Sequence, residues 1–259
     1  MSRHEIPVTV VIAARNEGDE IADCIASVTW AREVLVVEND STDETVVRAR
    51  AAGATVFSHP FVTIGAQRNA AIARATQPWI LVVDADERAS PALGAEVARL
   101  VAAHDGEPGA YRALRRNFFF GREILHGGWE RDRPVRLFRA DLRYDERPVH
   151  EHVITRGTVG TLHEPLLHTP YATLSEYFEK LGRYSRHWAE QHAARGRRTS
   201  LADVVLRPAV RMVSMLLWRG GWRDGMHGVV LASLAAMSVA AKYAQLWALE
   251  RGAPPEKKI

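Results

Sequence analysis

The sequence predicts an α/β fold, in which a mostly parallel β-sheet lies between helices and a basic helical region follows. Three observations predict it. Short apolar, β-branched segments alternate with segments of helical periodicity over residues 8–103, as they do in βαβ units. Residues 110–170 change to a sequence rich in arginine, histidine and aromatic residues. Residues 193–249 then carry eight basic and two acidic side chains, a net charge of +6 in a chain whose total is +3.

The composition is that of a globular protein. Hydrophobic residues make up 47% of the 259 residues and charged residues 25%, which excludes the disordered and fibrous classes. Cys24 is the single cysteine, which excludes a disulfide framework and a cysteine zinc site and favours a reducing compartment. The first apolar run, 6–14, is short and β-branched, so we expect a strand there and not a signal peptide.

Strands and helices are expected in alternation over the first hundred residues. Strands are predicted where apolar β-branched residues run together, at 8–14, 33–37, 55–57 and 79–83. Helices are predicted at 20–29, 41–52, 66–75 and 90–103. Ser41 and Glu44 have the spacing of a capping box for the second helix, and Gly53 is placed as its C-terminal glycine. Pro91 favours the start of the fourth helix.

The rest of the chain is expected to complete this domain and then add helices. Strand-like pieces at 111–114, 135–138 and 152–154 are interpreted as the acceptor side of a cleft. Helices are predicted at 175–194 and 201–218, with a glycine-rich turn at 220–225. The next 17 residues, 225–241, lack charge but fall short of a membrane-spanning helix. The expected division is therefore one domain at 1–195 and a basic amphipathic helical region at 196–259.

Polar clusters follow three of the predicted strands. They are Arg15-Asn16-Glu17, Glu38-Asn39-Asp40 and Asp84-Ala85-Asp86-Glu87. In a parallel α/β sheet, ligands bind at the carboxyl ends of the strands. The first two clusters could bind a nucleotide base and ribose, or could be polar loops that cap helices. The two aspartates of the third could share Mg²⁺ or Mn²⁺ with a diphosphate, or could be a solvated loop pair.

Two more groups of residues could carry chemistry. Arg68 and Asn69 open a predicted helix, which suits phosphate, although a surface pair would look the same. The spacing of four histidines matches no common zinc pattern; they are His150, His152, His163 and His168. Glu151, between two of them, could act as a general base toward an acceptor hydroxyl.

Taken together, nine segments resemble glycosyltransferase family 2, and more narrowly its bacterial lipopolysaccharide-core β-1,4-glucosyltransferase branch. The segments are VVIAARNE (10–17), WAREVLVVENDSTD (30–43), GAQRN (65–69), WILVVDADE (79–87), VRLF (135–138), VHE (149–151), KLGRY (180–184), GGWRDG (220–225) and KYAQLW (242–247). Their order and spacing carry the resemblance, which covers nearly the whole chain.

The resemblance implies the GT-A fold and inverting transfer from a nucleotide-diphospho-sugar, usually UDP-linked, with Mg²⁺ or Mn²⁺. It implies a metal on Asp86 and Asp84, with Glu151 as the base. The implied donor-binding residues are Arg15, Asn16, Glu17, Glu38, Arg68, Asn69 and Asp84, and the implied acceptor-side residues are Trp129, Arg136 and His150. Asn39 stands where some members carry an aspartate that touches the base, so the nucleobase stays open.

The basic tail bears Trp218, Trp222 and Trp247 on helices with an apolar face. Such helices suit an anionic membrane surface, or packing on the domain or a dimer interface. The resemblance then implies a lipid-linked or lipopolysaccharide-core glycan as acceptor. We expect a cytoplasmic enzyme, peripheral on the inner face of the bacterial cytoplasmic membrane and without a nucleic-acid partner.

Other functions remain open at this point. A polyprenyl-phosphate or other envelope-polysaccharide glycosyltransferase would share the same motifs. A sugar nucleotidyltransferase would carry a glycine-rich basic loop after the first strand, which residues 14–17 lack. A non-enzymatic binding protein would leave the strand-end carboxylates unexplained, because acids in a binding cleft repel phosphate.

Overall fold

The computed structural model describes residues 5–104, 106–147, 151–171 and 173–252. Its contacts divide the chain into two compact units. The first contains residues 1–116 and 131–168, and the second contains residues 117–130 and 169–259. The expected boundary at residue 195 therefore changes, because the helix that ends there belongs with the C-terminal helices.

The first unit is a seven-stranded sheet with helices on both faces. The sheet strands are β1 (Ile6–Ala14), β2 (Ala31–Glu38), β3 (Thr55–Ser58), β4 (Trp79–Val82), β6 (Ala110–Arg112), β9 (Val135–Arg139) and β10 (Val159–Thr161). The helices are α1 (Ile21–Ser27), α2 (Thr45–Ala51), α3 (Ile64–Ile72) and α4 (Pro91–Ala102). The strand order is β10-β6-β9-β4-β1-β2-β3, with β9 antiparallel to both of its neighbours. The mixed, mostly parallel α/β fold is confirmed.

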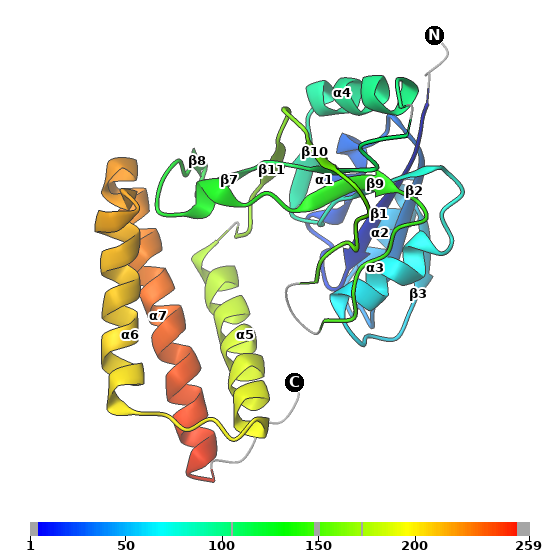
Figure 1. The fold of residues 1–259 in the computed structure, drawn as a ribbon. Helices are drawn as coiled ribbons and strands as arrows, with labels where there is room; N and C mark the ends of the chain where they lie inside the picture. The colour runs from blue at the N-terminus through cyan, green and yellow to red at the C-terminus, as the bar shows by residue number, and fades with distance from the viewer. Residues whose placement is uncertain (1–4, 105, 148–150, 172, 253–259) are drawn as a thin grey trace. The chain divides into compact units, whose positions relative to one another are not determined.

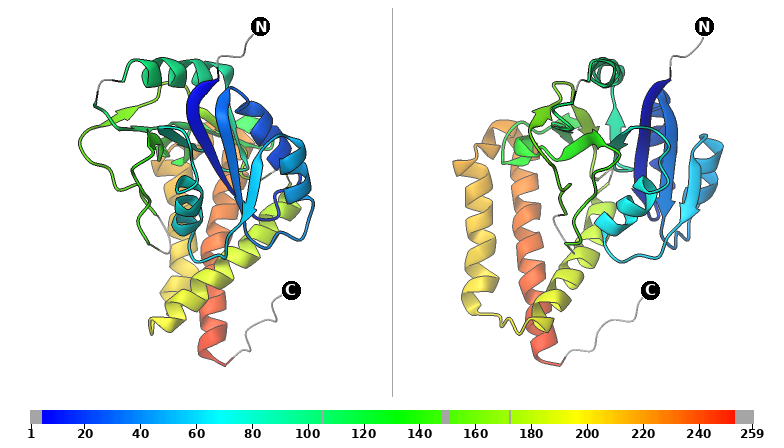
Figure 2. Two further views of the ribbon diagram at one scale, coloured as in Figure 1. Left: turned by 90° about the vertical axis from the view of Figure 1, so that its right-hand side faces the viewer. Right: turned by 45° about the vertical axis from the view of Figure 1, so that its right-hand side comes forward.

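The central strands are buried on both faces, which explains why they are continuous apolar runs. Val10 of β1 lies opposite Val34 of β2 and Leu81 of β4. Along β1, Val10 packs in a core that includes side chains of α1 and α4, whereas Val11 packs on the other face with Ala71 of α3. Figure 2 shows β1 and β2, the dark blue and blue strands, side by side. The parallel arrangement of β4, β1 and β2 brings their carboxyl ends to one edge of the sheet.

The predicted helix ends are partly confirmed. Ser90 accepts a hydrogen bond from the Leu93 amide and caps α4, and Gly53 follows α2 with a φ of +94°, a conformation that glycine adopts without strain. The capping box at Ser41 and Glu44 is wrong, because α2 begins at Thr45 and Glu44 makes no side-chain cap.

A second, smaller pairing brings distant residues to the DAD segment. β5 (Glu87–Ala89) starts directly after Asp86 and pairs antiparallel with β11 (Leu166–His168). This register places His168 opposite Glu87. Of the piece predicted at 152–154, the structure forms only an isolated bridge between Val153 and Tyr144 among the described residues.

The second unit is helical (Figure 1). It contains α5 (Leu174–Ala194), α6 (Leu201–Val213), a π-helical turn (Ser214–Trp218), a 3₁₀ turn η3 (Gly221–Asp224) and α7 (Gly225–Glu250). The strand β7 (Arg115–Phe119) crosses from the first unit into the second, where it pairs with β8 (Arg122–Glu123). The Tyr177 hydroxyl on α5 donates to the Leu234 carbonyl on α7 at 2.7 Å, which explains why α5 belongs to this unit.

The last helix is longer than the sequence pattern indicated. α7 continues past the uncharged run to Glu250, and residues 221–250 are long and apolar enough to cross a membrane by length and composition. One third of the apolar window is buried within the protein. The core helix of a helical bundle has the same length and composition, so this finding by itself does not place α7 in a membrane.

Candidate active site

The loops after β1 and β2 form one connected surface at the carboxyl edge of the sheet. Asn16 adopts a left-handed φ of +54°, and its side-chain oxygen accepts from the Thr42 amide at 2.8 Å. The Asn16 and Glu17 amides donate to the hydroxyls of Ser41 and Thr45. The two loops that were predicted to bind the nucleotide are therefore held together by their own hydrogen bonds.

The remaining predicted nucleotide residues lie on the same edge. The Glu38 carboxylate accepts from the Ser41 amide at 3.1 Å, so it closes the turn after β2. Arg15 is exposed and makes no hydrogen bond or ion pair with any side chain that the structure describes. Its guanidinium is thus available to a ligand, whereas Glu38 also has a structural role.

Asp84 follows β4 and lies among three arginines from distant parts of the chain. Its Oδ1 contacts Arg68 Nη2 at 2.6 Å, and its Oδ2 contacts Arg115 Nη2 at 2.6 Å and also Arg136. Arg136 is 2% exposed, whereas the Asp84 carboxylate is 27% exposed. Both carboxylate oxygens are therefore occupied by charge-assisted hydrogen bonds from guanidinium groups.

The charges behind Asp84 oppose one another. Burial would raise the pKa of Asp84, but the positive charges of Arg136 and Arg68 hold it well below its usual range. Glu87 is fully buried and contacts Arg115 at 2.5 Å and Arg136 at 3.2 Å. Burial raises the pKa of Glu87 to about 7, although Arg136 opposes the shift. The cluster therefore keeps Asp84 ionised.

Arg68 links the two carboxylates that the sequence singled out. From α3, its Nη1 contacts the Glu151 carboxylate at 2.5 Å and its Nη2 contacts Asp84. Glu151 is 14% exposed. Asn69, the other expected donor residue on α3, instead uses both its amide oxygen and nitrogen on the backbone of Tyr144. Both polar atoms of the Asn69 side chain therefore hold the segment before Glu151 against α3, and its expected role in donor binding stays a prediction.

A cavity of about 750 Å³ opens beside this group. Its lining contains five arginines and three carboxylates, namely Arg68, Arg112, Arg115, Arg133, Arg136, Asp84, Asp132 and Glu151. The charged lining therefore has an excess of two positive charges. Arg112 and Arg133 make no ion pair with any carboxylate in the described ranges. The size is that of a small-molecule site, and the charge favours an anionic ligand.

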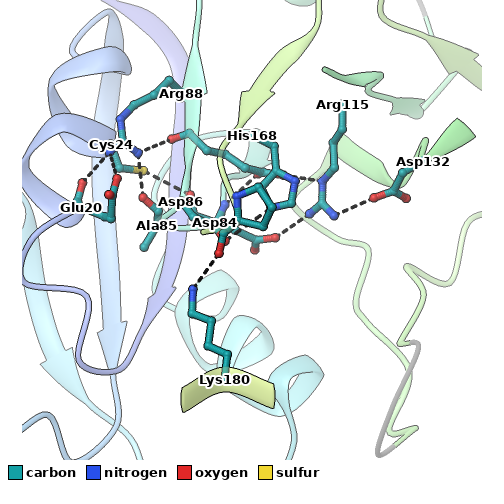
Figure 3. Close-up of polar contacts among 12 residues, drawn as sticks. Glu20, Cys24, Asp84, Ala85, Asp86, Arg88, Arg115, Asp132, His168 and Lys180 are labelled. Atoms are coloured by element: carbon teal, nitrogen blue, oxygen red, sulfur yellow. Dashed lines mark hydrogen bonds and ion pairs between the residues drawn. The ribbon is translucent and has the colours of Figure 1, made fainter. Parts of the chain in front are cut away.

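Asp86 does not lie among the arginines. Its Oδ2 is 3.4 Å from His168 Nε2, and the two side chains are 24% and 16% exposed (Figure 3). Burial would lower the pKa of His168, but the hydrogen bond and charge of Asp86 raise it. The pairing of β5 with β11 brings this histidine beside Asp86.

The donor set determines whether a divalent cation fits. Among the described residues, three or more ligand side chains gather nowhere. Asp86 and His168 nevertheless present an oxygen and a nitrogen 3.4 Å apart, close to the separation of about 3 Å between neighbouring ligands of an octahedral ion. Magnesium-type sites often take one or two protein ligands and fill the rest with phosphate and water. This pair therefore fits a cation that a diphosphate completes, whereas the Asp84 oxygens are already occupied.

The remaining predicted residues divide as follows. Arg136, expected on the acceptor side, lines the cavity. Trp129 belongs to the second unit, where its carbonyl accepts from the Asn117 side chain. His150 lies outside the described residues. The sequence interpretation missed Arg115, Glu87 and the pairing of His168 with Asp86; only strand register brings these together, and no local spacing indicates it.

Comparisons with known proteins show which family the chain resembles. The model of Glycosyl transferase family 2 matches residues 9–150, more than half of the chain. Lipopolysaccharide core biosynthesis glycosyltransferase LpsC of Rhizobium meliloti is 29% identical over 257 residues, 95% of each chain. An uncharacterized glycosyltransferase of Rickettsia conorii is 26% identical over 211 residues, 74% of this chain and 73% of its own.

Among solved structures, glucosyl-3-phosphoglycerate synthase from Mycobacterium tuberculosis, in complex with Mn²⁺, UDP and phosphoglyceric acid, is 24% identical. It aligns with a TM-score of 0.38 over 42% of this chain and 43% of that chain. The family match and the mixed, mostly parallel sheet support the GT-A class. The chain belongs to glycosyltransferase family 2.

Proposed function

We propose that the protein is an inverting hexosyltransferase that moves a sugar from a nucleotide-diphospho-sugar to a hydroxyl of a lipid-linked or lipopolysaccharide-core glycan. UDP-hexose is the proposed donor. The observation that carries this proposal is the cavity that holds Glu151 and Asp84 on the two ends of one arginine, Arg68. The relation to LpsC over 95% of both chains supports an envelope glycan as acceptor.

Glu151 is proposed as the general base. Its carboxylate lines the cavity, and Arg68 fixes its orientation. It takes the proton of the acceptor hydroxyl while that oxygen forms its bond to the anomeric carbon. The bond from this carbon to the diphosphate breaks on the opposite face, the nucleoside diphosphate leaves, and the anomeric configuration inverts. Positioned acid–base groups contribute about 10²- to 10⁴-fold in rate.

The arginines of the cavity are proposed to bind the negative charge of the donor. Arg68, Arg115 and Arg136 are already positioned by Asp84, so little rearrangement is required when charge develops on the leaving group. Arg112 and Arg133 supply the excess positive charge at the cavity. The nucleoside is proposed to lie along Arg15, Asn16, Glu17 and Glu38.

A divalent cation is proposed at Asp86 and His168, not at Asp84 and Asp86 together. When bound, the cation would offset charge on the leaving diphosphate. Asp86 supplies a carboxylate oxygen, and His168 must lose its proton to ligate. An imidazole is a softer ligand than oxygen, so this pair favours Mn²⁺ over Mg²⁺.

The helical unit is proposed to bring the enzyme to an anionic membrane surface at the cytoplasmic face. Large apolar side chains are exposed on α6 and around the turn into α7, including Leu201 (80%), Trp218 (74%) and Met226 (72%). Basic side chains such as Arg219 and Arg223 lie among them. Interfacial helices bind membranes through this combination of apolar and basic residues.

The test is a panel of nucleotide sugars with UDP-, GDP- and ADP-linked hexoses, each with Mn²⁺, Mg²⁺ or EDTA. Thermal shift measures binding, because a ligand that binds only the native state raises the melting temperature. We expect a UDP-hexose with Mn²⁺ to give the largest shift, and proton NMR of the product to show a β-linkage from an α-linked donor. Retention of configuration, or no shift with any nucleotide sugar, would contradict the proposal.

A further inference from the structure

The helical unit contains a second cavity, separate from the candidate active site. It is a groove of about 750 Å³ along α6, bounded by α7 and by Trp188 of α5. Its polar lining residues are Ser200, Asp203, Arg207, Arg211, Ser214, Lys242 and Tyr243. Arg207, Arg211 and Ser214 have the spacing i, i+4 and i+7, which places them on one helix face.

Two of the groove's three cations have no hydrogen-bond or ion-pair partner among the described residues. Arg207 is held by Asp203 at 2.5 Å, and Asp203 is the one carboxylate in the lining. Arg211 and Lys242, by contrast, make no hydrogen bond and no ion pair with the residues that the structure describes, although both are partly buried. The groove therefore presents two uncompensated positive charges beside the Ser214 hydroxyl.

The electrostatics agree with this arrangement. Burial lowers the pKa of Lys242, and the nearby charge of Arg211 lowers it further. Burial likewise lowers the pKa of Arg211, with Arg219 adding to the shift. Two partly buried like charges in one groove destabilise the fold, and an anion between them would remove that cost.

The other wall of the groove is apolar. Leu206, Val210 and Val239 line it, and Leu206 and Val210 remain 60% and 54% exposed. A free phosphate would use the cations and leave this wall in water. A ligand with a phosphate and an acyl chain would use both parts.

We propose that this groove binds a single anionic phospholipid, with its phosphate between Arg211 and Lys242 and its acyl chain along Leu206 and Val210. The inference rests on the proposed attachment to an anionic membrane and deepens it, because it replaces a general surface attraction with one lipid site. It is independent of the sugar-transfer chemistry in the first unit.

The test uses the full chain and soluble dihexanoyl phosphatidylglycerol below its micelle concentration, measured by calorimetry. Monomeric lipid removes the surface field of a membrane, so the general attraction does not contribute. We expect saturable binding that falls at least about tenfold in Arg211→Gln/Lys242→Gln. The matched control, Arg195→Gln/Arg198→Gln, removes two exposed charges of the same unit outside the groove and should bind within twofold of wild type.

Two further ligands identify the source of the phosphate. Glycerol 3-phosphate and zwitterionic dihexanoyl phosphatidylcholine should each bind at least about tenfold more weakly than phosphatidylglycerol. Equal binding of glycerol 3-phosphate would assign the groove to free phosphate, and equal binding of phosphatidylcholine would assign it to acyl chains alone; either result overturns the proposal. Equal binding of phosphatidylglycerol by wild type and groove variant also overturns it.

The experiment distinguishes this inference from the proposals on which it builds. If wild type and both variants bind anionic vesicles alike, the membrane proposal stands and the lipid site is refuted. The groove variant should fold, and its thermal midpoint should equal or exceed that of wild type because a repulsive pair is removed. Hydrogen exchange at residues 207–214 and 239–243 should slow on lipid addition in wild type and in the control, but not in the groove variant.

Discussion

Replacement of Arg136 by methionine should reveal how strongly the acids behind the site depend on buried arginines. Arg136 is 2% exposed and contacts Asp84 and the fully buried Glu87. After the change, Glu87 keeps the Arg115 guanidinium at 2.5 Å and the Asp84 amide, which donates to its Oε2 at 2.9 Å. Removal of one partner from a buried ion pair costs about 3–5 kcal/mol. Because Asp84 is 27% exposed and keeps two arginines, we expect about 3 kcal/mol of destabilisation at pH 8.

The cost should be smaller at low pH, because Glu87 can take up a proton. Burial raises the pKa of Glu87 to about 7 in the intact cluster, against the charge of Arg136, so the pKa rises further without Arg136. A carboxyl with a raised folded-state pKa stabilises the fold below its unfolded value of 4.5 and loses that contribution as the pH rises through 7. One pH unit above 7, the variant should therefore have lost about 1.4 kcal/mol more of this contribution than wild type.

Hydrogen exchange of the β4 and β9 amides measures this change within the first unit, which urea unfolding of a two-unit chain does not resolve. Because we expect Glu87 to take up a proton in Arg136→Met, the double variant Arg136→Met/Glu87→Gln should regain part of the stability and lose the pH dependence. Arg139→Met, on the same strand but partly exposed and without an ion pair among the described residues, is the matched control. Unchanged exchange in Arg136→Met at both pH values would refute the reasoning, because the cluster would then be solvated.

Three other predictions follow from single contacts. Glu151→Gln should lower transfer about 10²- to 10⁴-fold with unchanged Kd for the donor; a changed Kd with intact turnover would assign Glu151 to donor binding. Gly228→Ala places a Cβ atom 1.9 Å from a backbone carbonyl oxygen, so thermal unfolding should show a loss of about 1–3 kcal/mol or more, whereas Gly182→Ala, with open space around it, should not destabilise. Hydrogen bonds from Ser200 lower the pKa of Asp203 to about 2. A lowered pKa stabilises the fold above the ordinary value of 3.8 and that contribution is lost as the pH falls toward 2; circular dichroism should therefore show α6 weakening between pH 4 and 2. Ser200→Ala should reduce that dependence, because the Ser200 amide and Arg207 still lower the pKa of Asp203.

The strands could be predicted from the sequence because strands that are buried on both faces appear as uninterrupted runs of apolar residues. Val10 and Val11 face different cores, so no polar residue interrupts β1. The start of α2, by contrast, could not be predicted from the local sequence. Asp43 accepts from the Thr45 amide at 3.0 Å and from the Gly18 amide of the neighbouring loop at 2.9 Å, and this contact between distant residues replaces the local capping box.

The candidate site was predicted in part for a related reason. Asp84, Asp86 and Glu151 are acids directly after a strand or within a titratable cluster, so their types and positions indicate chemistry. Their partners come from residues 16 to 83 positions away. Asp84 was expected to bind metal, yet it lies among arginines that only the folded sheet brings together. The boundary between the units was predicted from the sequence to lie after α5. The amphipathic pattern of α5 does not indicate against which unit its apolar face packs.

The most direct test of the central claim is the binding of Mn²⁺ to the full chain in the presence of UDP, followed by the EPR signal of the free ion. We expect one bound ion and at least about tenfold weaker binding in both Asp86→Asn and His168→Gln. Asp19→Asn, which removes a 97% exposed acid, should bind as wild type does. Wild-type affinity in both Asp86→Asn and His168→Gln would contradict the account.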